Sequence, residues 1–408
     1  MNDTPEYSSA EITRLGLAGM ARNVGFGVNK VFAADLLSQL TRSQPLIGLI
    51  LGLEGLMGLI LNPLTGWISD RYPMRIGRRR IFVLLGLPAG ILWVLFADAK
   101  RLDWAILFLV SFYFFQQVGP TPYQAWMPDI VPPASWGRAS GLLNLWWQLG
   151  NFLAFLPIPL LWKSIHGGAF WVTAFIIVAG GAVTGLTVRE RRSNAVLKVA
   201  PPARTPWLSA DLGKYFAAQF LWWLAFESMA SFFTLFMVHT LHGTVIDSAL
   251  GMALFTLSSI VTALWFGRIY HRRAPRTILM VCLAGFGAMG FTGTLITEVN
   301  LGFILLFIAG IFWGGIQVIS YPWGSDLLRE ALPNHPSPEE YHGLLYGLVN
   351  VAQSVGLLIA APLAGAVISW QHGSYSAMFW VSLAACIVAI LVVASVGSQP
   401  RRGNLDAS

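Results

Sequence analysis

Apolar windows of about 20 residues recur along almost the whole chain, and this feature limits what the chain can fold into. A helix needs about that length to cross a bilayer, whereas a transmembrane β-barrel shows strands of about 10 residues with alternating polarity. Charged residues make up only 11% of the 408 residues, which is too few to cover water-soluble domains of ordinary size. The sequence therefore predicts an all-α integral membrane protein.

Proline, glycine and charged residues divide the windows into twelve predicted transmembrane helices. They are expected near residues 13–37, 45–67, 81–97, 104–127, 139–162, 170–188, 213–240, 248–267, 277–296, 301–324, 343–369 and 375–396. No cleavable signal peptide is expected, because the first apolar stretch contains Arg22 and Lys30. Cys282 and Cys386 both fall inside apolar windows, so no disulfide framework is expected.

The distribution of basic residues predicts the orientation in the membrane. With an even number of spans, both termini lie on one side. If that side is inside, the outer loops contain only Arg42, Lys100, Arg101 and Lys163. The inner loops and the tail then contain Arg71, Arg75, Arg78, Arg79, Arg80, Arg138, Arg189, Arg191, Arg192, Lys198, Arg204, Lys214, Arg268, Arg272, Arg273, Arg276, Arg329, Arg401 and Arg402. We expect a multi-pass protein of the cell (inner) membrane with both termini cytoplasmic. Its partner is the lipid bilayer, and no nucleic-acid partner is expected, because no recognition motif accompanies these charges.

Three sequence features recur in the same order about 200 residues later, which is typical of a duplicated unit. The pairs are Gly66 and Gly267 before basic loops, Tyr123 with Pro128 and Tyr321 with Pro322 closing spans before an acid, and the stretches Gly141 to Gly150 and Gly347 to Gly356. The sequence therefore predicts two pseudo-symmetric six-helix bundles at residues 1–188 and 213–408, joined by a cytoplasmic linker at 189–212.

Motifs for common enzyme chemistry are missing from the sequence. There is no Gly-x-x-x-x-Gly-Lys-Ser/Thr loop to hold ATP phosphates, no His-Glu-x-x-His helix and no cluster of His and Cys. We therefore expect neither an enzyme nor a cofactor or metal site, and any work must come from ion or solute gradients.

The inner loop after the second span has a specific motif. It reads Asn62-Pro-Leu-Thr-Gly-Trp-Ile-Ser-Asp-Arg-Tyr-Pro-Met-Arg-Ile-Gly-Arg-Arg-Arg80. This run resembles the signature of the major facilitator superfamily, and its fuller form is similar to the sucrose and disaccharide cation symporters, near the glycoside-pentoside-hexuronide transporters. Pro122-Tyr-Gln-Ala125 before Asp129 and Gly137-Arg-Ala-Ser-Gly141 resemble the same group. The resemblance implies a twelve-helix transporter.

The chain also departs from that group where charges are usual. The resemblance leads us to expect an Arg at Gln124 and a membrane Asp at Tyr113, and the melibiose-type relatives have carboxylates at the positions of Gly58 and Asn62. Because these charges are missing, the coupling mechanism cannot be transferred from the family.

The inner-loop motif is interpreted as a conformational latch. A carboxylate after a span can interact with a helix N-terminus and with nearby arginines at an energy of about 0.3–1 kcal/mol. The alternative for the arginines is plain anchoring by positive charge. The predicted latch residues are Gly66, Asp70, Arg71, Arg75, Gly77, Arg78 and Arg79.

Ionisable residues deep in a span are costly and therefore mark function. Arg22, Lys30, Asp35, Glu54 and Glu227 are of this kind, and all except Arg22, which can extend toward the inner surface, are coupling candidates. We predict that Lys30 and Glu227 neutralise each other until cargo or a proton competes for Glu227. The alternative for Lys30 and Glu227 is a permanent structural pair. Asp35 could instead be exposed to water near the end of its span, and Glu54 could instead form a buried hydrogen bond.

Amides and tryptophans at similar depth are the candidate substrate contacts, because a sugar needs flat apolar faces and hydroxyl partners. The set is Asn23, Lys30, Gln116, Gln117, Trp147, Gln148, Asn151, Trp223, Asn350 and Gln353. Each amide could instead form a structural hydrogen bond between helices.

The sequence as a whole predicts a secondary transporter that moves a sugar or glycoside, such as a disaccharide, with H⁺ or Na⁺ by alternating access. We expect it to be a monomer. An organic anion such as a hexuronide or aromatic acid is the first alternative, since Arg22 and Lys30 could bind a carboxylate. A non-transporting membrane factor that handles a pigment or lipid, or senses a ligand, is the second.

Overall fold

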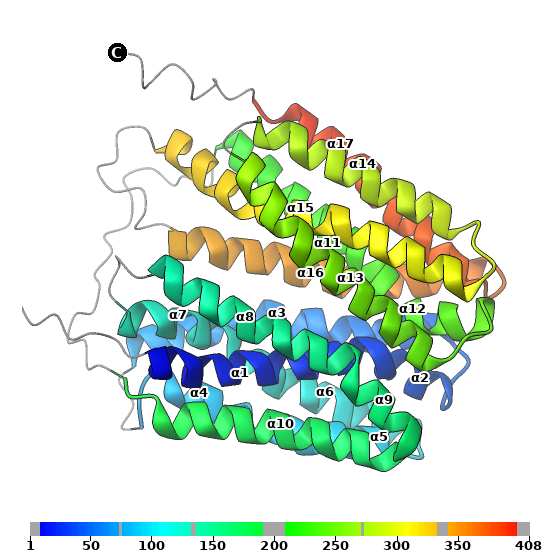
Figure 1. The fold of residues 1–408 in the computed structure, drawn as a ribbon, viewed down its shortest axis with the longest axis horizontal. Coiled ribbons are helices and arrows are strands. Elements are labelled where there is room, and N and C mark those ends of the chain that lie inside the picture. Colours follow the sequence, from blue (N-terminus) through cyan, green and yellow to red (C-terminus); the bar gives the residue numbers. More distant parts are fainter. Residues whose placement is uncertain are drawn as a thin grey trace, which may run out of the picture. The chain divides into compact units, whose positions relative to one another are not determined.

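The computed structural model describes residues 9–72, 76–131, 136–190, 209–270, 273–332 and 342–397. Within these ranges all regular structure is helical (Figure 1), which confirms the all-α prediction. Ten helices in these ranges are long and apolar enough to cross a membrane, by length and composition.

The chain divides into two compact units. The first comprises Met1–Lys198 together with Thr244–Ala253, and the second comprises Val199–Gly243 and Leu254–Ser408. Most of the predicted linker at 189–212 lies outside the described residues, so its boundaries stay a prediction.

The helices of the first unit follow the order of the first six predicted spans. They are α1 (Ser9–Val28), the π-helical turn η1 (Asn29–Ala33), α2 (Ala34–Ser38), α3 (Gln44–Arg71), α4 (Arg80–Leu85), α5 (Pro88–Ala97), α6 (Leu102–Val118), α7 (Pro120–Ile130), α8 (Trp136–Phe155), α9 (Pro157–Ser164) and α10 (His166–Thr187).

The later helices follow the other six predicted spans. They are α11 (Ala210–Ala230), α12 (Phe233–Leu235), the π-helical turn η4 (Phe236–Thr240), α13 (Val245–Ile269), α14 (Pro275–Gly293), α15 (Val299–Ala331), α16 (His342–Trp370), η6 (Tyr375–Ala377) and α17 (Met378–Ser395).

The two units repeat the same pairs of neighbouring helices. In the first unit α1 packs against α8 and α10, and α5 packs against α6 and α10. In the second unit α11 packs against α16 and α17, and α14 packs against α15 and α17. These pairs are equivalent under the repeat that the sequence predicts.

Proline breaks several spans that the sequence presents as continuous. Pro88 and Pro120 each start a new helix, because proline has no N–H to donate to the preceding turn. The expectation that Tyr321 and Pro322 close a span is wrong, since α15 continues through Pro322 to Ala331. A proline in a membrane helix is tolerated where neighbouring groups satisfy the freed carbonyl.

Two predicted spans, 13–37 and 139–162, form helices but are not among the ten that pass the apolar criterion. Their polar side chains lower the hydropathy: Arg22 and Lys30 in the first, and Asn144, Gln148 and Asn151 in the second. The least apolar spans therefore contain most of the candidate site of the first unit.

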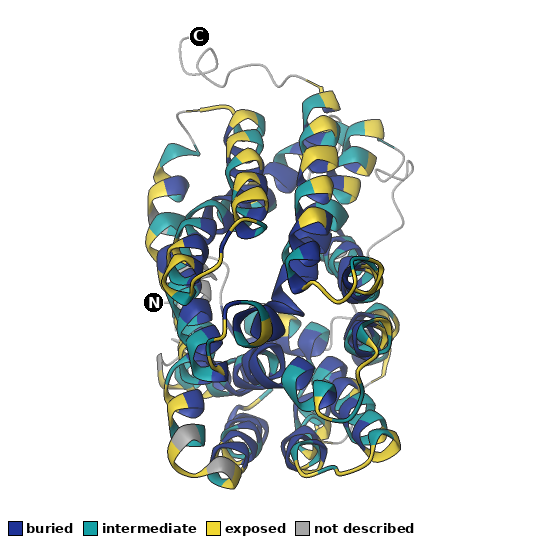
Figure 2. Ribbon diagram, turned by 90° about the vertical axis from the view of Figure 1, so that its right-hand side faces the viewer, coloured by how far each residue is buried: buried dark blue, intermediate teal, exposed yellow. Residues whose placement is uncertain are grey.

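Many of the longer helices carry both buried and exposed residues along their length (Figure 2). Large apolar side chains such as Leu145, Trp171 and Phe175 are exposed to 65%, 61% and 72%. In water such exposure would be unfavourable, whereas these side chains suit the hydrocarbon interior of a bilayer.

Candidate transport site

A π-helical turn in the first span positions two neighbouring polar residues. Asn29 and Lys30 begin the turn η1, and both are buried, with 4% and 8% of their surfaces exposed. A π turn adds a residue to the helical repeat and is frequent at functional sites. The Lys30 ammonium lies 4.9 Å from the centre of the Phe26 ring, one turn earlier.

The carboxylate of Glu54 contacts both polar residues of this turn. Its Oε2 lies 3.5 Å from Lys30 Nζ and accepts a hydrogen bond of 3.1 Å from Asn29 Nδ2. The hydroxyl of Tyr113 on α6 donates to Asn29 Oδ1 at 3.1 Å. We call Asn29, Lys30, Glu54 and Tyr113 the polar cluster, and it links the first, second and fourth spans. Removing either charged group would leave the other buried without its partner.

The predicted partner of Lys30 was Glu227, and the ion pair with Glu54 was not expected. Lys30 and Glu227 belong to different units, so their pairing stays a prediction. Glu227 itself is buried on α11, with 1% of its surface exposed.

Asp35 contrasts with these groups. It lies near the end of the first span, in α2, where Gln39 Nε2 donates to its Oδ2 at 3.2 Å on the exposed side. Its environment is that of a partly wetted surface carboxylate.

A second group of predicted contacts joins α1, α7 and α8. Asn23 Nδ2 donates to the carbonyl oxygen of Trp147 at 3.0 Å. Trp147 Nε1 donates to the Tyr123 hydroxyl at 3.3 Å, and that hydroxyl donates to the carbonyl of Leu15 at 3.2 Å. The indole therefore has a fixed orientation on the half-buried face of α8.

Three further amides of the first unit have hydrogen-bond partners. Asn151 Nδ2 donates to Gln148 Oε1 at 2.9 Å, one turn apart on α8. Gln116 Nε2 donates to the carbonyl of Arg22 at 3.3 Å, so it links α6 to α1. Gln117 is buried, with 8% of its surface exposed. Gln116 thus makes the kind of bond between helices that was the alternative interpretation.

In the second unit the predicted residues lie in an aromatic environment. Trp223 is 8% exposed and its ring meets Trp313 edge-on at 5.2 Å. Phe226 stacks on Trp313 at 4.4 Å, immediately before Glu227. Asn350 and Gln353 lie on α16 and are both half-buried.

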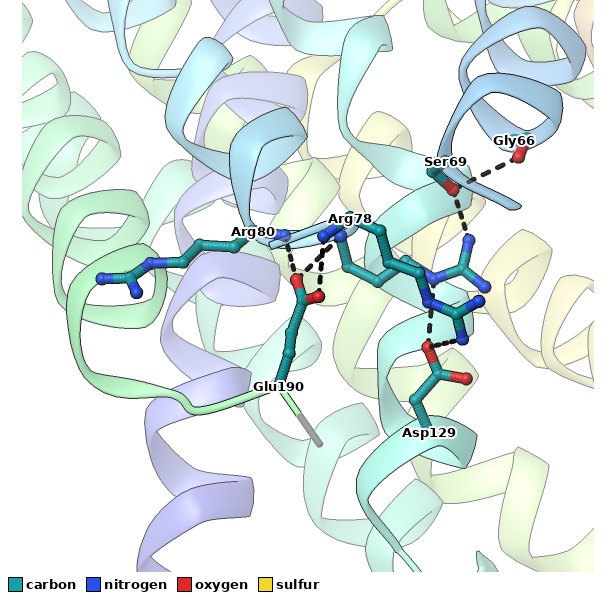
Figure 3. A network of polar contacts seen from close by, with 7 residues as sticks. Gly66, Ser69, Arg78, Arg80, Asp129 and Glu190 are labelled. Atoms are coloured by element: carbon teal, nitrogen blue, oxygen red, sulfur yellow. Dashed lines mark hydrogen bonds and ion pairs between the residues drawn. The ribbon is translucent and has the colours of Figure 1, made fainter. Parts of the chain in front are cut away.

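The inner-loop motif forms a compact polar network at the end of the first unit (Figure 3). The carboxylate of Glu190 accepts the backbone N–H groups of Arg78, Arg79 and Arg80 at 2.7, 2.7 and 2.5 Å. Arg80 also donates through its guanidinium to the carbonyls of Gly185 and Leu186. Glu190 thereby fastens the chain after α10 to the loop before α4.

Asp129 at the end of α7 binds the side chains of Arg78 and Arg79. Its Oδ2 lies 2.8 Å from Arg78 Nη2 and 3.1 Å from Arg79 Nε. Arg79 also donates to Ser69, whose hydroxyl donates to the carbonyl of Gly66 at 3.2 Å. These arginines are therefore paired, which goes beyond anchoring by charge alone.

The other predicted latch residues have different environments. Gly77 has φ +124°, and a Cβ there would lie 2.8 Å from Glu190, so both backbone and space require glycine. Gly66 faces Thr121, and Arg71 is exposed with its guanidinium 5.5 Å from the Trp67 ring. Arg75 and the side chain of Asp70 lie outside the described residues.

The sequence interpretation missed Asn29, Glu190 and the pairing role of Asp129, and it noted Tyr113 only as a departure from the family. A single acid between Arg189 and Arg191 was a usable signal for Glu190. No signal in the sequence connects Tyr113 with Asn29, which are 84 residues apart.

The comparison with known families gives the class of the protein. The family described as "Major Facilitator Superfamily" matches residues 15–335. This match indicates a transporter and not an enzyme, in keeping with the polar groups buried in the helices of the described residues. The chain belongs to the major facilitator superfamily.

Individual relatives are similar at low identity. A triacylglyceride transporter of Mycobacteroides abscessus is 27% identical over 34% of this chain, and the match covers 25% of that protein. A hexuronate transporter of Bacillus subtilis is 22% identical, over 93% of this chain and 92% of that protein. The mouse proton-associated sugar transporter A is 25% identical over 44% of this chain and 26% of its own length.

A crystal structure of the nucleoside transporter NupG shares the fold, with a TM-score of 0.76 at 12% identity. The similarity covers 95% of this chain and 100% of that one. The cargoes of these proteins differ, so the fold alone does not identify the cargo of this chain.

Proposed function

We propose that the chain moves a sugar or glycoside together with a cation, most simply a proton, by alternating access. The observation that carries this proposal is the polar cluster, in which Glu54 pairs with Lys30 inside the spans. An ionisable pair at this depth costs free energy and indicates a functional role.

Protonation of Glu54 is the proposed coupling step. A proton on Glu54 would cancel the attraction for Lys30 at 3.5 Å and leave the ammonium available to another partner. Asn29 donates to the same carboxylate oxygen, and Tyr113 donates to Asn29, so the cluster connects Glu54 to α6 as well as to Lys30. Glu227 remains a second proposed coupling carboxylate, because it is buried on α11.

A sugar cargo is supported by the fixed indole of Trp147 beside the amides of Asn23, Gln148 and Asn151. An indole face suits the C–H surface of a pyranose, and amides suit its hydroxyl groups. Two similar proteins are named for hexuronate and sugar transport. An acidic glycoside combines the features of both kinds of solute, the carboxylate of a hexuronate and the hydroxyl groups of a sugar.

The test uses purified protein in proteoliposomes with a panel of radiolabelled glycosides and an imposed pH gradient. Glu54→Gln should lose accumulation against a gradient but keep exchange of cargo between the two sides, because the variant mimics the protonated form permanently. Lys30→Met strands Glu54 and should impair both.

The matched control is Asp103→Asn, whose carboxylate pairs with Arg101 at the outer surface at 2.7 Å. It should accumulate cargo as the parent does. If Glu54→Gln also accumulates cargo at the parental level, and an uncoupler abolishes that accumulation, Glu54 does not couple and Glu227 is the next residue to test.

A further inference from the structure

Arg22 lies near the middle of the first span and lines a small crevice inside the first unit. The crevice has a volume of about 50 Å³, and its walls include Arg22, Phe82, Gly86, Gln116, Gly119 and Tyr123. These residues come from α1, α4, α6 and α7, with Gly86 between α4 and α5 and Gly119 between α6 and α7. A space of this size holds a group of a few atoms but not a sugar ring, since one water needs about 10–15 Å³.

The guanidinium of Arg22 can donate hydrogen bonds to a group in this crevice. Within the described ranges it makes no hydrogen bond and no ion pair, and Gln116 binds only the backbone carbonyl of Arg22. An arginine side chain has five N–H donors and no acceptor. Arg22 is half-buried, so these donors are accessible to an acceptor that the described part of the chain does not supply.

The local charges leave an excess positive charge at this depth. Glu54 attracts Arg22 electrostatically, but its carboxylate is already paired with Lys30. Two cations thus share one carboxylate in this part of the first unit. An arginine without a counter-ion is costly in the middle of a membrane, so a bound anion would relieve a real energetic penalty.

The walls of the crevice offer another way to satisfy Arg22. Pro120 has no N–H, so the carbonyl of Gln116 lacks its usual helical donor. Water could connect that carbonyl to the guanidinium, and Arg22 would then be purely structural. A bridging water would satisfy hydrogen bonds of Arg22 but would leave its positive charge unbalanced. A bound anion would do both, so it explains the environment of Arg22 more fully.

We propose that the Arg22 crevice is a binding site for a small anion, namely the carboxylate group of an acidic glycoside or a free chloride ion. The carboxylate source rests on the proposed function, whereas the chloride source does not. The planar guanidinium can bind a carboxylate through two parallel hydrogen bonds, and Gln116 and Tyr123 border the same space. This site is separate from the polar cluster, because Arg22 is not part of the Lys30–Glu54 pair.

The first experiment measures thermal unfolding of the purified full-length chain in detergent. The probes are sodium chloride, sodium glucuronate and glucose, each against a bulky sulfonate salt at equal ionic strength. We compare the parent with Arg22→Gln and Arg22→Lys, and with Arg42→Gln as the control, since Arg42 is an exposed arginine of an outer loop. Arg22→Gln should weaken the apparent Kd of the anion at least tenfold, whereas Arg42→Gln should leave it unchanged.

The second experiment needs no variant and covers the case in which Arg22→Gln does not fold. Phenylglyoxal labelling of the parent chain, read by mass spectrometry at each arginine, should slow at Arg22 when the anion is added but not at Arg42.

The outcomes separate the two sources. Protection by glucuronate, with none by chloride or glucose, identifies the carboxylate of the cargo. Protection by chloride identifies a free-ion site, even if no glycoside is ever transported. The proposal is overturned if no anion stabilises the parent or slows labelling at Arg22, or if Arg22→Gln responds as the parent does. Because binding is measured without transport, failure here leaves the proposed function to its own test.

Discussion

Glu190 offers a quantitative test of the inner-loop network. Its carboxylate accepts three consecutive backbone N–H groups, two at Oε1 and one at Oε2. In Glu190→Gln one oxygen becomes an NH₂ group, which faces a backbone donor and cannot accept from it. The substitution therefore leaves at least one N–H without an acceptor and removes the negative charge from the others.

The expected decrease in the free energy of unfolding follows from these hydrogen bonds. A hydrogen bond to a charged group contributes about 1.5–3 kcal/mol, and contributions that share one side chain are not additive. Because Glu190 is half-buried and glutamine keeps one acceptor oxygen, we expect the free energy of unfolding to fall by about 2 kcal/mol. For a unit of 150–250 residues this corresponds to a fall in the unfolding midpoint of about 4–8 °C.

The assay is thermal unfolding of the purified chain in detergent, followed by intrinsic tryptophan fluorescence at a fixed scan rate. Glu298→Gln is the matched control, because Glu298 precedes α15 and makes no capping hydrogen bond with its side chain. Its midpoint should change by less than about 1 °C, as surface substitutions usually do. Equal midpoints for Glu190→Gln and the control would refute the reasoning from the three N–H bonds.

Two further predictions concern the site and the orientation. Trp147→Ala should raise the KM for the cargo or abolish binding while the protein still folds, whereas normal binding with a lower unfolding midpoint would make the indole a packing residue. A reporter enzyme that is active only outside the cytoplasm, fused after Ser408, should remain inactive, because the basic residues predict an inner C-terminus. Strong reporter activity would reverse the predicted orientation.

The sequence by itself was enough to predict the helices and their duplication. Each predicted span corresponds to a helix, and the two helices broken at Pro88 and Pro120 still follow the predicted windows. Hydropathy succeeds here because a span must be apolar over a length set by the bilayer, and that information lies within about 20 consecutive residues. The motif from Asn62 to Arg80 also indicated the family that the profile comparison confirmed.

Only the tertiary structure decided which polar groups meet. Glu190 lies 112 residues from Arg78, and Tyr113 lies 84 residues from Asn29. Glu54 was a candidate in the sequence, but its ion pair with Lys30 depends on a π turn that shifts the register of the first span. Such pairs depend on the rotation and depth of each helix against its neighbours. Those quantities are set by packing between spans and not by the hydropathy of any one of them.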